Sequence, residues 1–212
     1  MNLKNKRILI TAGPTWVPID DVRVISNVAT GATGALCAKK LSARGAKVTL
    51  LLGPCGKHSL SNSIRLINFR FFNELRDILK RELKNNKYDV VIHSAAVSDY
   101  RPSVKYAQKV NSGRKTWTVN LMPTPKIIDL IRKIDRTLFL VGFKFEPGAR
   151  KKILIDKTKT LINRARLDLA IANTVYKNKY RAYIINQNKA FGPLMNKDAL
   201  AERLINLIGE SL

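Results

Sequence analysis

The sequence predicts an α/β fold built on a doubly wound, mostly parallel sheet with an additional antiparallel hairpin at one edge. Three observations carry this prediction: short apolar segments, helical segments between them, and two segments that break the alternation. Apolar strands separated by helices are typical of parallel sheets with right-handed crossovers. The 212 residues contain no repeat, linker or low-complexity segment. We therefore expect a single domain over residues 1–212.

The expected elements follow from the apolar pattern in chain order. Ile8 to Ile10 is apolar and largely β-branched, which favours a strand, and the small residues Gly31 to Gly34 then open a helical pattern. The later strands are expected where further short apolar segments occur, and the later helices where the helical pattern recurs. The expected strands are Arg7–Thr11, Ala46–Leu52, Ile64–Phe69, Tyr88–Ser94, Arg136–Phe143 and Leu167–Ala172. The expected helices are Gly34–Ala43, Asn73–Lys84, Ala149–Ala165 and Asp198–Gly209.

Two further segments predict antiparallel strands at one edge of the sheet. Polar and apolar residues alternate in Thr116–Leu121, and Tyr180–Ile185 runs into a polar Asn186-Gln187-Asn188 turn. Such alternation is typical of half-buried antiparallel strands.

The formal net charge of +24 is the one extreme value of the composition. It implies attraction either to a nucleic acid backbone or to small substrates that carry several phosphates. The lysines and arginines are spread along the chain at helix-surface spacing, without an aromatic RNA-binding motif, a helix-turn-helix pattern or a basic tail. We therefore regard nucleic acid as an unlikely partner and solvated helix faces as the simpler interpretation.

The remaining composition is that of an ordinary globular protein, with 45% hydrophobic and 25% charged residues. The N-terminus resembles a first strand rather than a signal peptide, and no apolar run is long enough to span a bilayer, so we expect a cytoplasmic protein without a membrane partner. Cys37 and Cys55 have no spacing that indicates a disulfide framework or a zinc site, and we expect no metal held by protein ligands. His93 is expected to be a buried strand-end residue and His58 a loop residue.

Ligands of such sheets bind beyond the carboxyl ends of the strands. Those ends are Thr11–Gly13, Ser94–Pro102, Phe143–Glu146 and Ala172–Thr174. Small residues at Ser94, Ala95 and Ala96 would let a flat base or a phosphate approach the backbone, and Asp99 could bind a ribose, a base or a metal.

About twenty residues separate the first strand from the glycine turn, whereas a dinucleotide site needs its glycines at once. The chain also lacks a GxGxxG sequence after the first strand and a Tyr-x-x-x-Lys pair, which argues against an NAD(P)-dependent oxidoreductase. Gly53 to His58 does not match a P-loop, because the first glycine is too close to Gly56-Lys57 and His58 stands where a P-loop has Ser or Thr.

Several motifs, taken in order, resemble those of phosphopantothenate cysteine ligase, the ligase of coenzyme A biosynthesis. They are "ITAGPTWVPIDDVRVISN", "TGATG", "AAVSDYRP", "PTPKII", "VGFKFE" and "LDLAIANT", with Lys109 ten residues beyond Asp99. The resemblance runs nearly end to end and implies a Rossmann-like homodimer. It also implies the substrates 4'-phosphopantothenate, a nucleoside triphosphate (CTP, with ATP as the alternative) and cysteine, and Mg²⁺ bound with the triphosphate.

The resemblance assigns roles to particular residues. It makes Asn27 and Lys109 catalytic, with Asn27 donating to a carboxylate or acyl-phosphate oxygen and Lys109 also meeting the nucleotide from a flexible flap. Arg23, Gly31 and Gly34 would bind the phosphopantothenate side, although Asn27 could instead cap a turn. The remaining nucleotide-binding residues would be Ser94, Ala95, Ala96, Asp99, Pro125, Lys126, Ile127, Ile128 and Phe143.

The sequence departs from the family pattern at three places. The flap reads Lys109-Val110-Asn111-Ser112, which lacks two of the family's cations, and Ala32-Thr33 replaces the usual Lys-Met between the glycines. The two lysines usual on the helix before "LDL" fall at Leu161 and Ala165, where Lys159 and Arg164 could substitute, so Lys159 is counted among the nucleotide-binding residues. These departures keep open the alternative of a nucleic-acid-binding or inactive homologue. No decarboxylase domain precedes the first strand, so we expect no flavin and a stand-alone ligase or a single domain.

Overall fold

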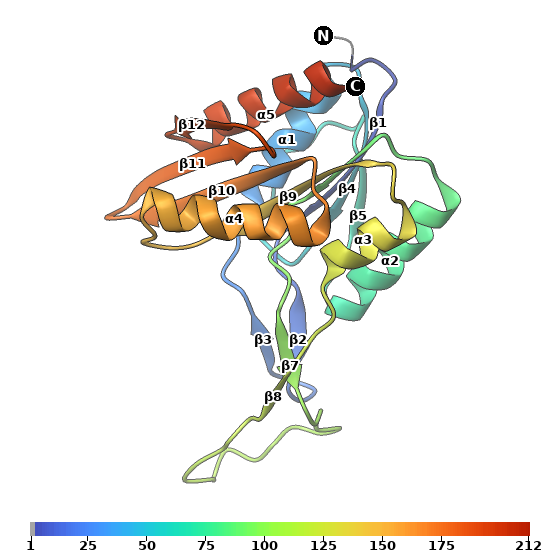
Figure 1. The fold of residues 1–212 in the computed structure, drawn as a ribbon. Helices are drawn as coiled ribbons and strands as arrows, with labels where there is room; N and C mark the ends of the chain where they lie inside the picture. The colour runs from blue at the N-terminus through green and yellow to red at the C-terminus, as the bar shows by residue number, and fades with distance from the viewer. Residues whose placement is uncertain (1–2) are drawn as a thin grey trace.

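The computed structural model describes residues 3–212, which form an eight-stranded sheet in the order β12-β11-β10-β9-β6-β1-β4-β5 (Figure 1). Six of these strands are parallel: β1 (Arg7–Ala12), β4 (Lys47–Leu52), β5 (Arg65–Asn68), β6 (Val90–His93), β9 (Phe139–Phe145) and β10 (Leu169–Tyr176). The edge is antiparallel, because β11 (Lys179–Ile185) runs against β10, and β12 (Ala190–Leu194) runs against β11. The predicted mostly parallel sheet with an antiparallel edge hairpin is therefore confirmed.

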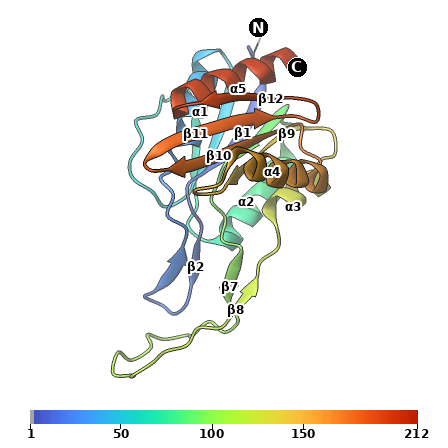
Figure 2. The same cartoon turned by 60° about the vertical axis from the view of Figure 1, so that its left-hand side comes forward.

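Helices cover both faces of this sheet (Figures 1 and 2). One face packs against α1 (Ala32–Ala43) and α5 (Lys197–Ser211), and the other against α2 (Phe72–Asn85), α3 (Ile127–Ile134) and α4 (Lys151–Ala165). Every residue of β1 after Arg7 is buried, as expected for a strand covered on both faces. Within the described range, no helix is both long and apolar enough to cross a membrane.

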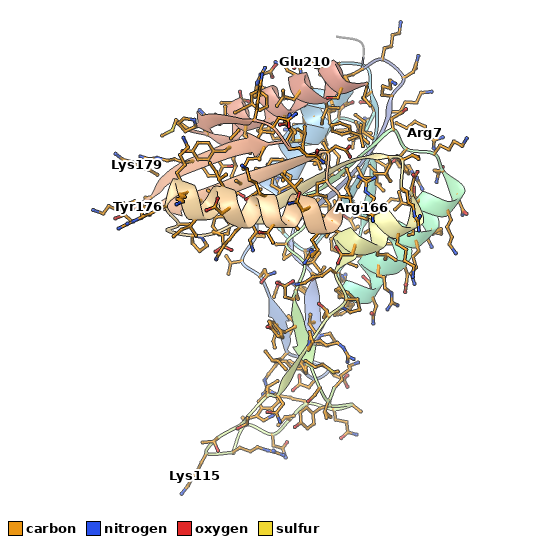
Figure 3. All side chains as sticks on the ribbon, viewed as in Figure 1. Arg7, Lys115, Arg166, Tyr176, Lys179 and Glu210 are labelled. Carbon is orange, nitrogen blue, oxygen red and sulfur yellow. The ribbon has the colours of Figure 1, made fainter. Side chains whose placement is uncertain are left out.

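Two small antiparallel sheets project from the carboxyl edge of the main sheet (Figures 1 and 2). The first is the hairpin of β2 (Trp16–Pro18) and β3 (Val24–Ser26). The second pairs β7 (Tyr100–Pro102) with β8 (Leu121–Pro123), and the chain between them extends outward to a tip near Lys115 (Figure 3). We call residues 99–124 the arm.

The prediction of a strand over Thr116–Leu121 was wrong. Thr116 to Asn120 has no strand pairing, and Leu121 opens β8, which lies in the arm and not at the edge of the main sheet. Within this segment the Trp117 ring packs edge-on against Tyr106, with the ring centroids 5.9 Å apart. The other predicted strands and helices are present, with ends shifted by a few residues.

Six elements were not predicted: β2, β3, β7, β8, β12 and α3. The first five are only three to five residues long, too short for a recognisable apolar pattern. Helix α3 could have been predicted from the sequence, because Ile127, Ile128 and Ile131 recur at helical spacing, and they are buried on one side of the helix.

Candidate active site

A cleft of about 1020 Å³ opens at the carboxyl edge of the sheet. It is lined by the ends of β1, β6, β9 and β10, by the first turns of α1 and α3, and by one side of α4. Each of the four strand ends named from the sequence contributes at least one lining residue. This is the position at which open α/β sheets bind ligands.

The glycine turn brings the start of α1 against the sheet. Gly31 has φ 68°, a left-handed conformation that favours glycine. At Gly34, a Cβ atom would lie 2.5 Å from the Cβ of Ala12 and 2.7 Å from the Oγ of Ser94, so no other residue fits there without a shift. The N–H groups of the first helical turn therefore lie at the wall of the cleft, where an anion can accept hydrogen bonds.

Asn27 connects the long loop to the segment after β6. Its side-chain amide donates to the carbonyl oxygens of Ala96 and Val97, both at 3.1 Å. These bonds use Nδ2, and within the described residues Oδ1 accepts no hydrogen bond. Asn27 thus spans two cleft-lining loops that are about seventy residues apart in sequence and does not merely cap a local turn.

The opposite rim pairs Asp99 with Lys126. The Oδ1 of Asp99 lies 2.6 Å from the Nζ of Lys126, and both side chains remain partly exposed. Thr124 supports the pair, because its hydroxyl donates to the carbonyl of Ser98 at 2.6 Å and its N–H to the carbonyl of Asp99 at 2.9 Å. These contacts therefore hold the segment after β6 against the residues that lead into α3.

The outer wall of the cleft is cationic. Glu146 accepts ion pairs from Lys144 at 2.9 Å and Lys157 at 2.8 Å, and hydrogen bonds from these two ammonium groups lower the pKa of Glu146. Farther along α4, Arg164 lies 3.4 Å from Asp129. Lys157 and Arg164 are two helical turns apart, so they share the cleft side of α4.

His93 ends β6 at the floor of the cleft. Its Nδ1 lies 2.8 Å from the hydroxyl of Thr11, which is fully buried. Burial lowers the pKa of His93 to about 4, so the imidazole is neutral at physiological pH. The expectation of a buried strand-end histidine is confirmed, since only 8% of the residue is exposed.

The structure brings most of the predicted site residues to this cleft. Those that line it are Asn27, Gly31, Gly34, Ser94, Ala95, Ala96, Asp99, Pro125, Lys126, Ile127, Ile128 and Phe143. Arg23, Lys109 and Lys159 do not line it. The functional roles assigned to all of these residues remain predictions.

Arg23 lies in the β2–β3 hairpin, where its side chain already has binding partners. Its guanidinium binds Asp20 at 2.6 Å and the carbonyl of Val110 at 3.1 Å, and it lies 5.1 Å from the centroid of the Trp117 ring. Desolvation raises the pKa of Asp20, but three backbone N–H groups and the Arg23 guanidinium outweigh it and lower this pKa to about 2. Arg23 and Asp20 thus fasten the arm to the β2–β3 hairpin.

Lys109 and Lys159 are separated from the cleft for different reasons. Lys109 is exposed on the arm, beside Val110, whose N–H donates to Asp20 at 3.1 Å. Lys159 is two residues beyond Lys157 on α4, and residues two apart do not share a helix face. The cleft side of that helix carries Lys157, Thr160, Leu161 and Arg164.

Several residues that line the cleft had no role predicted from the sequence: Lys144, Glu146, Lys157, Asn173 and Lys197. For Lys157 a signal existed, because positions 157, 160, 161 and 164 have the spacing of one helix face and Arg164 had already been considered. Across residues 3–212, no group of three or more His, Cys, Asp or Glu side chains could hold a metal ion.

Comparison with known proteins gives consistent results. The family described as "DNA/pantothenate metabolism flavoprotein C-terminal domain" matches residues 3–212. The coenzyme A biosynthesis bifunctional protein CoaBC of Thermococcus kodakarensis is 37% identical over 100% of this chain and 53% of its own length. The CoaBC protein of Borreliella burgdorferi is 31% identical over 97% of this chain and 53% of its own. The chain thus spans about half the length of the curated relatives it matches.

Solved structures share the fold. The DNA/pantothenate metabolism flavoprotein of Streptococcus pneumoniae superposes with a TM-score of 0.87 at 27% identity, covering 98% of this chain and 100% of that one. A Cab2 variant solved as a complex with phosphopantothenate-cysteine superposes with a TM-score of 0.78 at 20% identity, covering 98% and 87%. The second likeness is a likeness of fold alone.

Proposed function

The chain belongs to the DNA/pantothenate metabolism flavoprotein C-terminal domain family, and from this membership and its cleft we propose that it is a phosphopantothenate cysteine ligase. It would join 4'-phosphopantothenate to cysteine at the expense of a nucleoside triphosphate, in coenzyme A biosynthesis in the cytoplasm. Its curated relatives are named for that biosynthesis, and a solved protein of the same fold binds phosphopantothenate-cysteine.

One observation carries the proposal: a single cleft is lined by both halves of the expected site. The loop of Asn27 and the glycine turn form one side, and Ser94 to Asp99 with the start of α3 form the other. A ligase that first joins a carboxylate to a nucleotide must hold both anions against each other, because most of its rate advantage comes from positioning.

The reaction has two steps. In the first, a carboxylate oxygen of 4'-phosphopantothenate attacks the α-phosphorus of the nucleotide, and the bond to pyrophosphate breaks. This step converts the carboxylate oxygen into a leaving group. In the second, the cysteine amine attacks the acyl carbon, loses a proton and expels the nucleoside monophosphate, which leaves an amide.

The residues of the cleft suit these steps. Asn27 is held by two carbonyl oxygens and is therefore preorganised to meet the reacting carboxyl group. The first turn of α1 and the cationic wall of Lys144, Lys157 and Arg164 suit the phosphates. Phe143 and the isoleucines of α3 offer apolar surface to a base.

Magnesium would enter with the nucleotide. The two carboxylates at the cleft that could meet a cation, Asp99 and Glu146, are already paired with lysines. The donor set therefore fits a Mg²⁺ ion held largely by phosphate oxygens and water rather than by a protein cage.

We propose that the protein acts as a homodimer. Arg23 and Lys109 lie on the hairpin and the arm, outside the cleft of their own chain. They can take part in ligation only if the arm reaches a cleft. Because the arm projects from the molecule, it could reach the cleft of a second copy.

The test is pyrophosphate release with Mg²⁺ and 4'-phosphopantothenate, with CTP and ATP assayed separately, with and without cysteine. We expect release that depends on phosphopantothenate, and nucleoside monophosphate with ligated product once cysteine is added. We expect CTP to be the better substrate. No release with either nucleotide would contradict the proposal, and salt-sensitive retention on DNA without turnover would favour the nucleic-acid-binding alternative.

A further inference from the structure

The imidazole of His93 has a defined orientation at the floor of the cleft. The hydroxyl of Thr11 lies 2.8 Å from its Nδ1 and also receives the N–H of Ala95 at 3.3 Å. A hydroxyl has one proton, and among the described residues Nδ1 is the acceptor within reach of it. Thr11 therefore donates to Nδ1, and the neutral ring carries its own proton on Nε2.

The Nε2–H group is the part of the ring that is left for a ligand. It makes no hydrogen bond within residues 3–212, and it is not one of the buried polar atoms without a partner, which are Trp117 Nε1, Arg132 Nε, Asn173 Oδ1, Thr174 Oγ1 and Tyr180 OH. His93 itself lines the cleft. The cleft thus has an uncharged donor on its floor with a fixed direction.

The surroundings of His93 favour a flat, uncharged group over a phosphate. His93 lies beside Gly142 in the neighbouring strand, and a Cβ atom on Gly142 would lie 2.8 Å from Ile128 and 2.6 Å from Leu167. Lys126, Lys144 and Lys157 lie toward the rim, in ion pairs with carboxylates. The space directly over Gly142 is therefore filled by Ile128 and Leu167, and a ring that reaches His93 from the cleft would meet apolar side chains such as Ile128 and Phe143 and one N–H donor.

We propose that His93 donates a hydrogen bond from Nε2 to a ring nitrogen or carbonyl oxygen of the nucleotide base, and that Thr11 fixes the tautomer that allows this. The inference rests on the proposed function, since it concerns the nucleotide of that reaction. His93 is then a binding residue, and Thr11 is a positioning residue that acts through it.

The experiment measures KM for the nucleotide and for 4'-phosphopantothenate in matched variants. His93→Leu should raise the nucleotide KM about tenfold, the size expected for one hydrogen bond, and leave the phosphopantothenate KM unchanged. His93→Gln keeps a donor and should recover part of the loss. Thr11→Val should raise the nucleotide KM, and Thr11→Ser should restore it.

Thr49→Val is the control for Thr11→Val, because Thr49 is a buried threonine on the adjacent strand β4 whose hydroxyl accepts from Tyr88 outside the cleft. It should not change either KM. Equal rises in both KM values for His93→Leu, or no rise in a folded variant, would overturn the inference.

A second probe separates the base from the phosphates. Inorganic tripolyphosphate should inhibit wild type and His93→Leu with the same Ki, because it has no base. A Ki that rises in parallel with the nucleotide KM would assign His93 to phosphate and overturn the inference. Inactivity of the wild type would contradict the proposed function alone, and calorimetric titration of both proteins with CTP and with ATP would then decide the role of His93.

Discussion

Asn27 couples two loops of the cleft through one side chain. Its Nδ2 atom is used by the carbonyls of Ala96 and Val97, so its orientation is set before any ligand arrives. The preorganised oxygen and amide dipole then need no rearrangement during the reaction.

We expect Asn27→Ala to lower kcat by on the order of 100-fold, the typical loss for one preorganised polar group at an acyl centre. The exposed position predicts little change in Tm. Ser26→Ala is the matched control next to it and should retain most activity, as measured by ligated product. Normal turnover of Asn27→Ala would remove this residue from the site.

His93 predicts a pH dependence of stability. Its pKa is about 4 in the folded chain against an ordinary 6.5, so below pH 6.5 the unfolded chain binds a proton that the folded chain does not. The free energy of unfolding should therefore fall between pH 6.5 and pH 4, by about 3 kcal/mol from this group. Urea unfolding of wild type and His93→Gln across this range would check it, since the variant should lose that part of the slope.

At the residue scale, the sequence predicted the members of the site that follow a strand end or open a helix. It did not predict the surroundings of Arg23. That guanidinium is bound by Asp20, Val110 and Trp117, and the last two lie almost ninety residues or more away along the chain. A contact of this kind depends on tertiary structure and has no local pattern.

The elements show the same division. Inner strands of the main sheet, such as β1, β4 and β6, are apolar runs covered on both faces, so their sequences predict them. The strands of the hairpin and arm are three residues long, and each exists because its partner is present. The alternation in Thr116–Leu121 was misleading, because only Leu121 is in a strand and Trp117 instead packs against Tyr106 within the arm.

Helix α4 carries a prediction at this scale. Lys157→Ala and Arg164→Ala should each raise the nucleotide KM several-fold, because both cations lie on the cleft side. Lys159→Ala is the matched comparison, from a position that does not line the cleft. Steady-state kinetics would check this, and a larger effect at Lys159 than at Lys157 would mean that α4 presents a different face to the substrate.

The whole molecule predicts complementation between inactive variants. Asn27→Ala and Lys109→Ala should each be nearly inactive alone. If the arm serves the cleft of a second copy, mixed dimers contain one intact site, and random mixing should restore about a quarter of wild-type activity. The measurement is ligation after unfolding and refolding the two variants together. Full activity of Lys109→Ala alone would contradict the role of the arm.

The net charge of +24 predicts an ionic-strength effect on substrate capture. The two phosphorylated substrates that we propose are polyanions, so their attraction to the molecule is screened by salt. We expect both KM values to rise between about 0.05 and 0.3 M salt with little change in kcat. Flat KM values would show that the surface charge lies too far from the cleft to act.

The pairing of α1 with α5 also bears on how the chain is made. Helix α1 follows the first strand, yet α5, which covers it, lies some 150 residues later; the two are joined by packing and by ion pairs from Lys40 and Arg44 to Glu202. During translation at roughly 5–20 residues per second, the side of α1 that packs against α5 therefore stays uncovered for many seconds. A nascent chain stopped before residue 197 would expose this surface to chaperones and to aggregation, whereas the released chain of 212 residues would bury it.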